Sequence, residues 1–180
     1  MGSECAFTNL FIWRDYYRTF WAEKHGFLII QVQVEDNTFY LQPFGGEDED
    51  LPLLIREMKE YHGGSFEFRG IYECSLERLS KIKGDQEFEE DRDSWDYVYL
   101  QEDLANLRGR RYHGQKNHYN AFKKGNPDYV FEMINPENYA ECLNFGEEWC
   151  KARIKEDPSI AWEWRALQEA FVNFELLGLR

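Results

Sequence analysis

The sequence predicts an α+β protein with a mixed, mostly antiparallel sheet that is flanked by helices and followed by a helical C-terminal extension. Three observations lead to this fold class. Helical and strand-like runs alternate along the 180 residues, strands linked as hairpins interrupt that alternation, and the pattern becomes all-helical after about residue 135. We therefore expect a sheet-containing domain over residues 1–135. Residues 136–180 form the extension, which packs on that domain or leads into a further one.

Turn and capping signals set the boundaries of the expected elements. Gly26 fits the end of a first helix, and Asp36-Asn37 fits a hairpin turn. Pro52 suits the first turn of the next helix, while Asn135-Pro136 and Asp157-Pro158 suit the starts of the last two. The expected elements are, in order, a helix over 7–26, strands over 27–35 and 38–44, a helix over 45–64, a strand over 65–71, a helix over 75–84, a strand over 95–101, a helix from about 113, a strand over 129–134, and helices over 136–155 and from 158.

The composition limits the partners that the protein can have. The chain is 43% hydrophobic, which excludes a disordered protein, and its formal charge is −13. That charge opposes general binding to nucleic acid or to an anionic membrane, so only a local basic patch could recruit a phosphate. An apolar leader and an apolar run long enough to cross a membrane are both missing from the sequence, and we expect a cytoplasmic protein without a membrane span.

Cysteine spacing and acidic clusters do not predict a metal site. The four cysteines form no CxxC pair, match no zinc spacing with histidine, and are expected to be reduced packing residues. Residues 47–50 are acidic, but carboxylates before a helix also favour its positive N-terminal end. The carboxylates of Asp91, Asp93 and Asp96 could hold a divalent cation, although a solvated turn explains them better. We expect no metal and no tightly bound cofactor.

A basic island lies at residues 107–124, LRGRRYHGQKNHYNAFKK, which hold six of the 21 Lys and Arg and no acidic residue. Arg108, Arg110 and Arg111 stand in a loop with glycine, and a helix is expected to begin near His113. Loop amides, a helix N-terminus and arginine side chains together make a site for an anion such as a phosphate. The alternative is a solvated basic face that balances the protein's own acidic surface.

Known phosphate-binding motifs do not describe this island. Neither GxxxxGK[ST] nor GxGxxG occurs in the chain. The pyrophosphate loop of acetyltransferases, [QR]xxGx[GA], is nearly matched from Arg111 to Lys116, where a small residue would be needed in place of the lysine. His113 and His118 are five positions apart and cannot bind one metal as an i, i+4 pair, although either could act as a general base.

Three stretches together carry a resemblance to a known family. They are residues 3–14 (SECAFTNLFIWR), 96–104 (DYVYLQEDL) and 109–118 (GRRYHGQKNH). With these stretches, the chain resembles over its whole length bacterial proteins related to the C-terminal domain of phosphatidylglycerol lysyltransferase. The resemblance implies a GNAT-like acyltransferase fold. It also implies that the usual protein is a tandem of two such domains, of which this chain would be the N-terminal half.

The resemblance further implies a function and a set of site residues. Relatives move an aminoacyl group from a charged tRNA to an acceptor, so the expected activity is acyl or aminoacyl transfer, with acyl-CoA or aminoacyl-tRNA as donor. The donor's phosphates are expected near the island, and the acceptor amine near residues that orient or deprotonate it. The donor-binding candidates are Arg108, Arg110, Arg111 and Lys116, and the catalytic candidates are His118, Tyr112 and Asn117.

A second hypothesis is a non-catalytic half-domain that binds a phosphate-bearing ligand, a tRNA or a partner protein, and a purely structural protein is a third. The C-terminal stretch AFVNFELLGLR motivates the second, because an apolar terminal helix needs a cover. That cover is the domain's own core, a second copy of the chain in a homo-oligomer, or a second GNAT-like domain.

Overall fold

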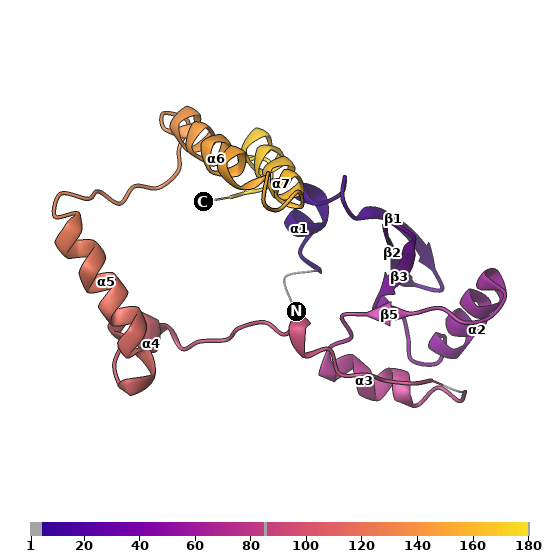
Figure 1. Ribbon diagram of the computed structural model, residues 1–180. Coiled ribbons are helices and arrows are strands. Elements are labelled where there is room, and N and C mark those ends of the chain that lie inside the picture. The colour runs from indigo at the N-terminus through magenta and orange to yellow at the C-terminus, as the bar shows by residue number, and fades with distance from the viewer. Residues whose placement is uncertain (1–4, 85, 180) are drawn as a thin grey trace.

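The computed structural model describes residues 5–84 and 86–179 and confirms the mixed α+β class. Helices and strands are mixed along the chain, with a sheet in the N-terminal half and helices after it (Figure 1). The elements are α1 (Phe7–Ile12), β1 (Arg18–Lys24), β2 (Phe27–Val34), β3 (Asn37–Leu41), β4 (Phe44–Gly45), α2 (Leu51–His62), β5 (Phe68–Arg69), α3 (Glu73–Ser80), the short 3-10 turn η2 (Arg92–Ser94), α4 (Gln101–Asn106), η3 (Arg110–Tyr112), α5 (His113–Gly125), α6 (Tyr139–Arg153) and α7 (Ile160–Val172).

The sheet is mostly antiparallel, as predicted. Its strands lie in the order β1-β2-β3-β5, and β4 pairs with the first residues of β2. The β1–β2 and β2–β3 pairs are antiparallel, whereas β5 runs parallel to β3, with Tyr40 opposite Phe68. The parallel pair follows from α2, which crosses back over the sheet before β5 begins.

Both faces of the sheet are covered, which explains why β2 is apolar along nearly its whole length. Side chains of one face pack under α2 and α3, and those of the other face pack against the N-terminal residues and α1. The first cluster is Phe27, Ile29, Tyr40, Leu51, Leu54, Ile55, Met58 and Leu79, and the second is Ile30, Val32 and Leu41 with Leu10 at its edge.

The predicted helix over 7–26 is wrong in its second half. The helix ends at Ile12, and Arg18–Lys24 forms strand β1. Lys24 pairs with Phe27, so His25 and Gly26 make a two-residue hairpin turn in which both have positive φ, 51° and 75°. Gly26 is therefore a hairpin glycine rather than a helix cap.

Of the remaining N-terminal elements, the helix predicted over 45–64 begins only at Leu51, and the strand predicted over 65–71 is limited to Phe68–Arg69. The turn and helix-end signals are more accurate. Val34 pairs with Asn37, so the next hairpin turns at Glu35-Asp36, one residue before the predicted position. The helix α2 has Pro52 in its first turn and ends at Gly63, whose φ of 65° is left-handed. Its last residue, His62, was expected at a helix C-terminus and lies there.

The predicted strands over 95–101 and 129–134 are extended but have no partner strand in the part of the chain that the structure describes. The first leads from η2 to α4 and the second from α5 to α6, so the α4–α5 hairpin lies away from the sheet (Figure 1). The alternation of apolar residues predicted the extended backbone of both segments. It did not predict pairing, because a strand also needs a neighbouring strand with which to form hydrogen bonds.

The helices α6 and α7 pack side by side, and α7 also contacts α1 near the start of the chain (Figure 1). The predicted helix over 136–155 begins at Tyr139. In the turn before it, the Asn135 side chain accepts a hydrogen bond from the backbone amide of Glu137. Part of the apolar C-terminus is covered here, since Phe171 is buried against Tyr139 and Phe174.

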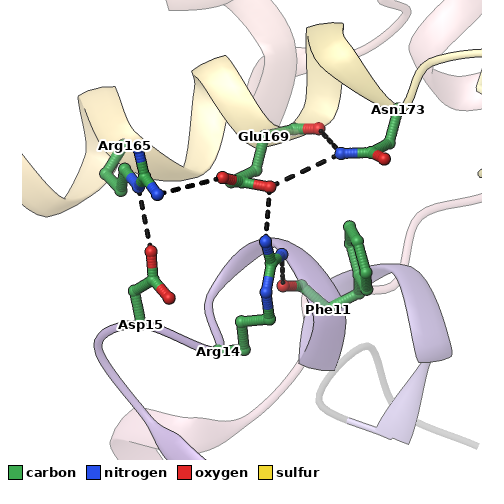
Figure 2. A network of polar contacts seen from close by, with 6 residues as sticks. All are labelled: Phe11, Arg14, Asp15, Arg165, Glu169 and Asn173. Carbon is green, nitrogen blue, oxygen red and sulfur yellow. Dashed lines mark hydrogen bonds and ion pairs between the residues drawn. The ribbon is translucent and has the colours of Figure 1, made fainter.

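A network of polar contacts joins the two ends of the described chain (Figure 2). Arg14 donates to Glu169 at 2.6 Å and to the carbonyl of Phe11 at 2.7 Å. Arg165 bridges Glu169 at 3.2 Å and Asp15 at 2.9 Å. The carboxylate of Glu169 thus forms ion pairs with two arginines, Arg165 of α7 and Arg14 of the segment after α1.

Replacing Glu169 with glutamine is expected to lower the free energy of unfolding by about 1–2 kcal/mol, because it weakens a charge-assisted hydrogen bond and leaves Arg14 uncompensated. Urea denaturation followed by circular dichroism measures this change. The matched control is Glu147→Gln, which affects only the exposed pair with Lys151 and should cost less than about 0.5 kcal/mol. Equal losses for the two variants would contradict the role of Glu169.

Candidate functional site

The basic island folds into a helical hairpin in which α4 turns into α5. Two residues with positive φ reverse the chain, Leu107 at 46° and Gly109 at 90°. A side chain added at Gly109 would meet nothing, so backbone conformation alone favours glycine there. This turn places Arg108, Arg110 and Arg111 immediately before the N-terminus of α5.

Arg111 and Tyr112 hold the turn of this hairpin. Arg111 forms an ion pair with Asp103 of α4, and its guanidinium carbon lies 4.7 Å from the ring centroid of Tyr112. Tyr112 itself is buried. The charge of Arg111 is therefore compensated inside the hairpin, and the tyrosine ring anchors the turn against it.

The other basic residues of the island form no ion pair within residues 5–84 and 86–179. They are Arg108, Arg110, Lys116, Lys123 and Lys124. The N-terminus of α5 has no capping side chain and no acidic residue in its first turn. Cations beside the positive end of a helix repel its dipole, so a bound anion would stabilise this end.

The predicted catalytic residues do not converge on one point. Asn117 and His118 are consecutive on α5, directly after the donor-binding candidate Lys116, and successive side chains of a helix point about 100° apart. Asn117 and His118 are exposed, whereas Tyr112 is buried at the base of the hairpin. The sequence thus predicted where the basic residues lie, but these side chains do not all point toward one site.

A cavity of about 300 Å³ lies elsewhere, between β1 and α2, and sequence reasoning missed it. Tyr40 lines this cavity, and its hydroxyl accepts a hydrogen bond from Gln31 Nε2 at 2.8 Å. The same hydroxyl lies 2.8 Å from His62 Nε2. Burial raises the pKa of Tyr40. The sequence held no signal for it, because residues 18–24 were expected in a helix.

Glu57 lies at the rim of this cavity. Lys24 contacts its carboxylate at 2.6 Å and His25 at 2.9 Å, and hydrogen bonds from both lower the pKa of Glu57. His25, predicted at a helix C-terminus, instead lies in the hairpin turn and pairs with this carboxylate. Among the residues that line the cavity, Gln31 thus pairs with Tyr40 and Lys24 pairs with Glu57.

An open groove of about 730 Å³ lies between α6 and α7. It is lined mainly by apolar side chains, and its charged residues, Glu141 and Glu163, are acidic, so it does not suit a phosphate. Burial raises the pKa of the Cys150 thiol there, which disfavours the reactive thiolate. All four cysteines are free, but Cys74 is exposed and is therefore not the packing residue that was predicted.

Two further observations concern metals and membranes. Among the residues that the structure describes, no three His, Cys, Asp or Glu side chains gather as metal ligands would. The carboxylate of Asp91 instead accepts from the Ser94 hydroxyl at 2.6 Å, and Asp48 pairs with Arg78 at 2.5 Å. Within the same residues, none of the helices has the length and apolar character needed to span a bilayer.

Comparison with known proteins places these features in a family. A crystal structure of a conserved protein of unknown function from Bacteroides thetaiotaomicron VPI-5482 shares 33% sequence identity with the chain and superposes with a TM-score of 0.82. The similarity covers 97% of this chain and 60% of the Bacteroides chain, so our chain spans less than two thirds of that relative. No curated protein matches the chain. The family described as phosphatidylglycerol lysyltransferase, C-terminal, matches residues 1–180, and the chain therefore belongs to that family.

Proposed function

We propose that this protein is an acyltransferase-like protein with a GNAT-like fold, which binds the phosphates of an acyl or aminoacyl donor at the start of α5. The observation that carries this proposal is an uncapped helix N-terminus beside Arg108, Arg110 and Lys116, none of which has an acidic partner in the described chain. Such a surface costs free energy unless an anion occupies it. Membership of a lysyltransferase-related family supports a donor that carries an activated acyl group.

Transfer from such a donor needs no enzyme nucleophile. The amine of an acceptor attacks the donor carbonyl carbon, a C–N bond forms, and the C–S bond of a thioester or the C–O bond of an ester breaks. The amine loses a proton to a base, and the leaving thiolate or alkoxide takes up a proton. Binding geometry and charge stabilisation supply most of the acceleration.

The proposal assigns different tasks to the residues of the island. Arg108, Arg110 and Lys116 hold the donor's phosphates. His118 is the candidate base because a neutral imidazole nitrogen can accept a proton, and Asn117 is the candidate that orients the acceptor. Tyr112, being buried under Arg111, supports the turn that presents these side chains.

The test is the triple variant Arg108→Ala, Arg110→Ala, Lys116→Ala, titrated with acetyl-CoA and with lysyl-tRNA. Each lost charge-assisted contact is expected to weaken binding of the true donor at least tenfold, since such contacts contribute about 1.5–3 kcal/mol. The matched control is Arg18→Ala, Lys83→Ala, Lys155→Ala, which removes the same charge from exposed residues outside the island. Equal weakening by both triple variants would contradict a local site.

The alternative function is binding of a phosphate-bearing ligand, a tRNA or a partner protein without catalysis. The divergence of Lys116, Asn117 and His118 around α5 favours it, because a reacting centre needs convergent groups. In that case the island variants still weaken binding, but no transfer to an amine occurs with either donor. For tRNA, the affinity should fall steeply as salt is added, and a flat response would exclude it.

A further inference from the structure

Two extended segments, residues 95–100 (WDYVYL) and 129–134 (YVFEMI), have no partner strand within the described part of the chain. We propose that each is a strand of a sheet whose neighbours come from a second folded unit, which seats against both segments. The unit we name is the counterpart of the part of the Bacteroides protein that lies outside the match, that is, the remaining 40% of its chain beyond the 60% covered. This proposal does not depend on acyl transfer.

The backbone of both segments is available for pairing. The amides of residues 96–100 and of 130–134 donate no hydrogen bond within the described part of the chain. Neither segment contains proline, so every one of these amides can donate to a neighbouring strand. The carbonyls of Leu100 and Met133 already accept hydrogen bonds. The remaining row of donors and acceptors is the template onto which another strand adds.

The side chains of both segments point to the same conclusion. Val98 is 90% exposed and Phe131 is 83% exposed, although both residue types are usually buried. In 95–100 the apolar and aromatic residues occupy both faces, with Tyr97 and Tyr99 on one and Val98 and Leu100 on the other. That pattern is typical of a central strand that is covered on both faces, not of a strand at a solvated edge.

The exposed area is large enough to make an interface. Trp95, Tyr97, Tyr99 and Phe131 are each at least half exposed, and a fully buried aromatic side chain removes roughly 150–250 Å² from water. These four rings alone therefore offer on the order of 500 Å², against the roughly 800 Å² per partner of a standard interface. The groove between α6 and α7 extends the surface, because Ile134 lines it.

The arrangement of the chain identifies the occupant. The first segment leads from η2 to α4 and the second from α5 to α6, so the two segments connect the α4–α5 hairpin to the rest of the chain (Figure 1). The same arrangement recurs in the Bacteroides protein, since the superposition has a TM-score of 0.82 over 97% of our chain. In that protein the matched part is accompanied by further polypeptide, which favours a second unit over a second copy of this chain.

This placement has a consequence for the basic surface. Arg108, Arg110 and the lysines of α5 stand in the stretch of sequence that connects the two proposed strands. A unit that pairs with both strands therefore borders the island. We infer that an anion held by Arg108, Arg110 and Lys116 is enclosed between the two units.

The experiment compares the 180-residue chain with a tethered protein, in which the unmatched 40% of the Bacteroides protein follows the chain through a flexible Gly/Ser linker. The linker raises the effective concentration to the millimolar range, so even a weak contact is populated. Hydrogen exchange measured by mass spectrometry should be at least tenfold slower in peptides covering 95–100 and 129–134 of the tethered protein than in the chain alone.

Charged variants test which surface is responsible. Val98→Lys and Phe131→Lys should each return the tethered protein to the exchange rates of the chain alone, without changing the circular dichroism of the chain. The control is Val172→Lys, which places the same charge at an 82% exposed position on α7. Unchanged exchange in the tethered protein would overturn the proposal. So would a homodimer of the chain alone with both segments protected, because the occupant would then be a second copy.

Discussion

Replacing Phe27 with alanine is expected to lower the free energy of unfolding by about 3–5 kcal/mol. Phe27 is 0% exposed and lies at the start of β2, where it packs in the cluster under α2 and α3. The guanidinium carbon of Arg78 lies 5.0 Å from the centroid of its ring, so the variant loses a cation–π contact as well as packing. Guanidinium denaturation followed by circular dichroism measures the change.

The control for this prediction is Phe7→Ala. Phe7 belongs to α1 and is 71% exposed, so its removal deletes little buried area and leaves no internal cavity. We expect a loss below about 1 kcal/mol. If Phe7→Ala proved as costly as Phe27→Ala, the cluster under α2 and α3 would not be the main core of the protein.

The second large effect is expected for Gly46→Ala, at about 2–5 kcal/mol, the sum of a conformational and a packing cost. Gly46 has a φ of 59°, which a residue with a side chain adopts at a cost of about 1–2 kcal/mol. An added Cβ would also lie 2.4 Å from two carbons of the Phe27 ring, which is fully buried and has no room to withdraw. The same denaturation experiment applies.

Two further variants separate these costs. Gly63→Ala has nearly the same φ, 65°, but its Cβ would meet nothing, so it should show the conformational cost alone. In the double variant of Phe27→Ala with Gly46→Ala the methyl group enters the space that the ring has left. Its total cost should therefore be smaller than the sum of the single costs. Additive costs would show that the two residues do not oppose each other.

Local signals predicted the elements whose ends depend on one or two residues. The helix α2 is an example, because Pro52 and Gly63 act through their own backbone conformations. The β2–β3 hairpin was predicted within one residue for the same reason. Residues 18–24 were not, since their aromatic side chains fit helical spacing, and only pairing with β2 decides that they form a strand.

In the candidate site, too, local sequence signals predicted some features, whereas features that depend on the fold were missed. Composition alone located the basic island, and an excess of cations in so acidic a chain is visible without a fold. The ion pair of Arg111 with Asp103 and the burial of Tyr112 were not visible, because both depend on the turn at Leu107 and Gly109. The cavity beside β1 needed the hairpin that the sequence misassigned.

The contact between Arg14 and Glu169 has a consequence for the order of folding. It joins residues 155 positions apart, and closing so long a loop costs more chain entropy than the local β hairpins that precede it. Rates of folding fall as contacts become more distant in sequence, so the sheet with α2 and the α6–α7 pair are expected to form first, each from near neighbours. Docking of α7 onto α1, through this contact and the ion pair of Arg165 with Asp15, is then expected as a late step that joins two parts already folded.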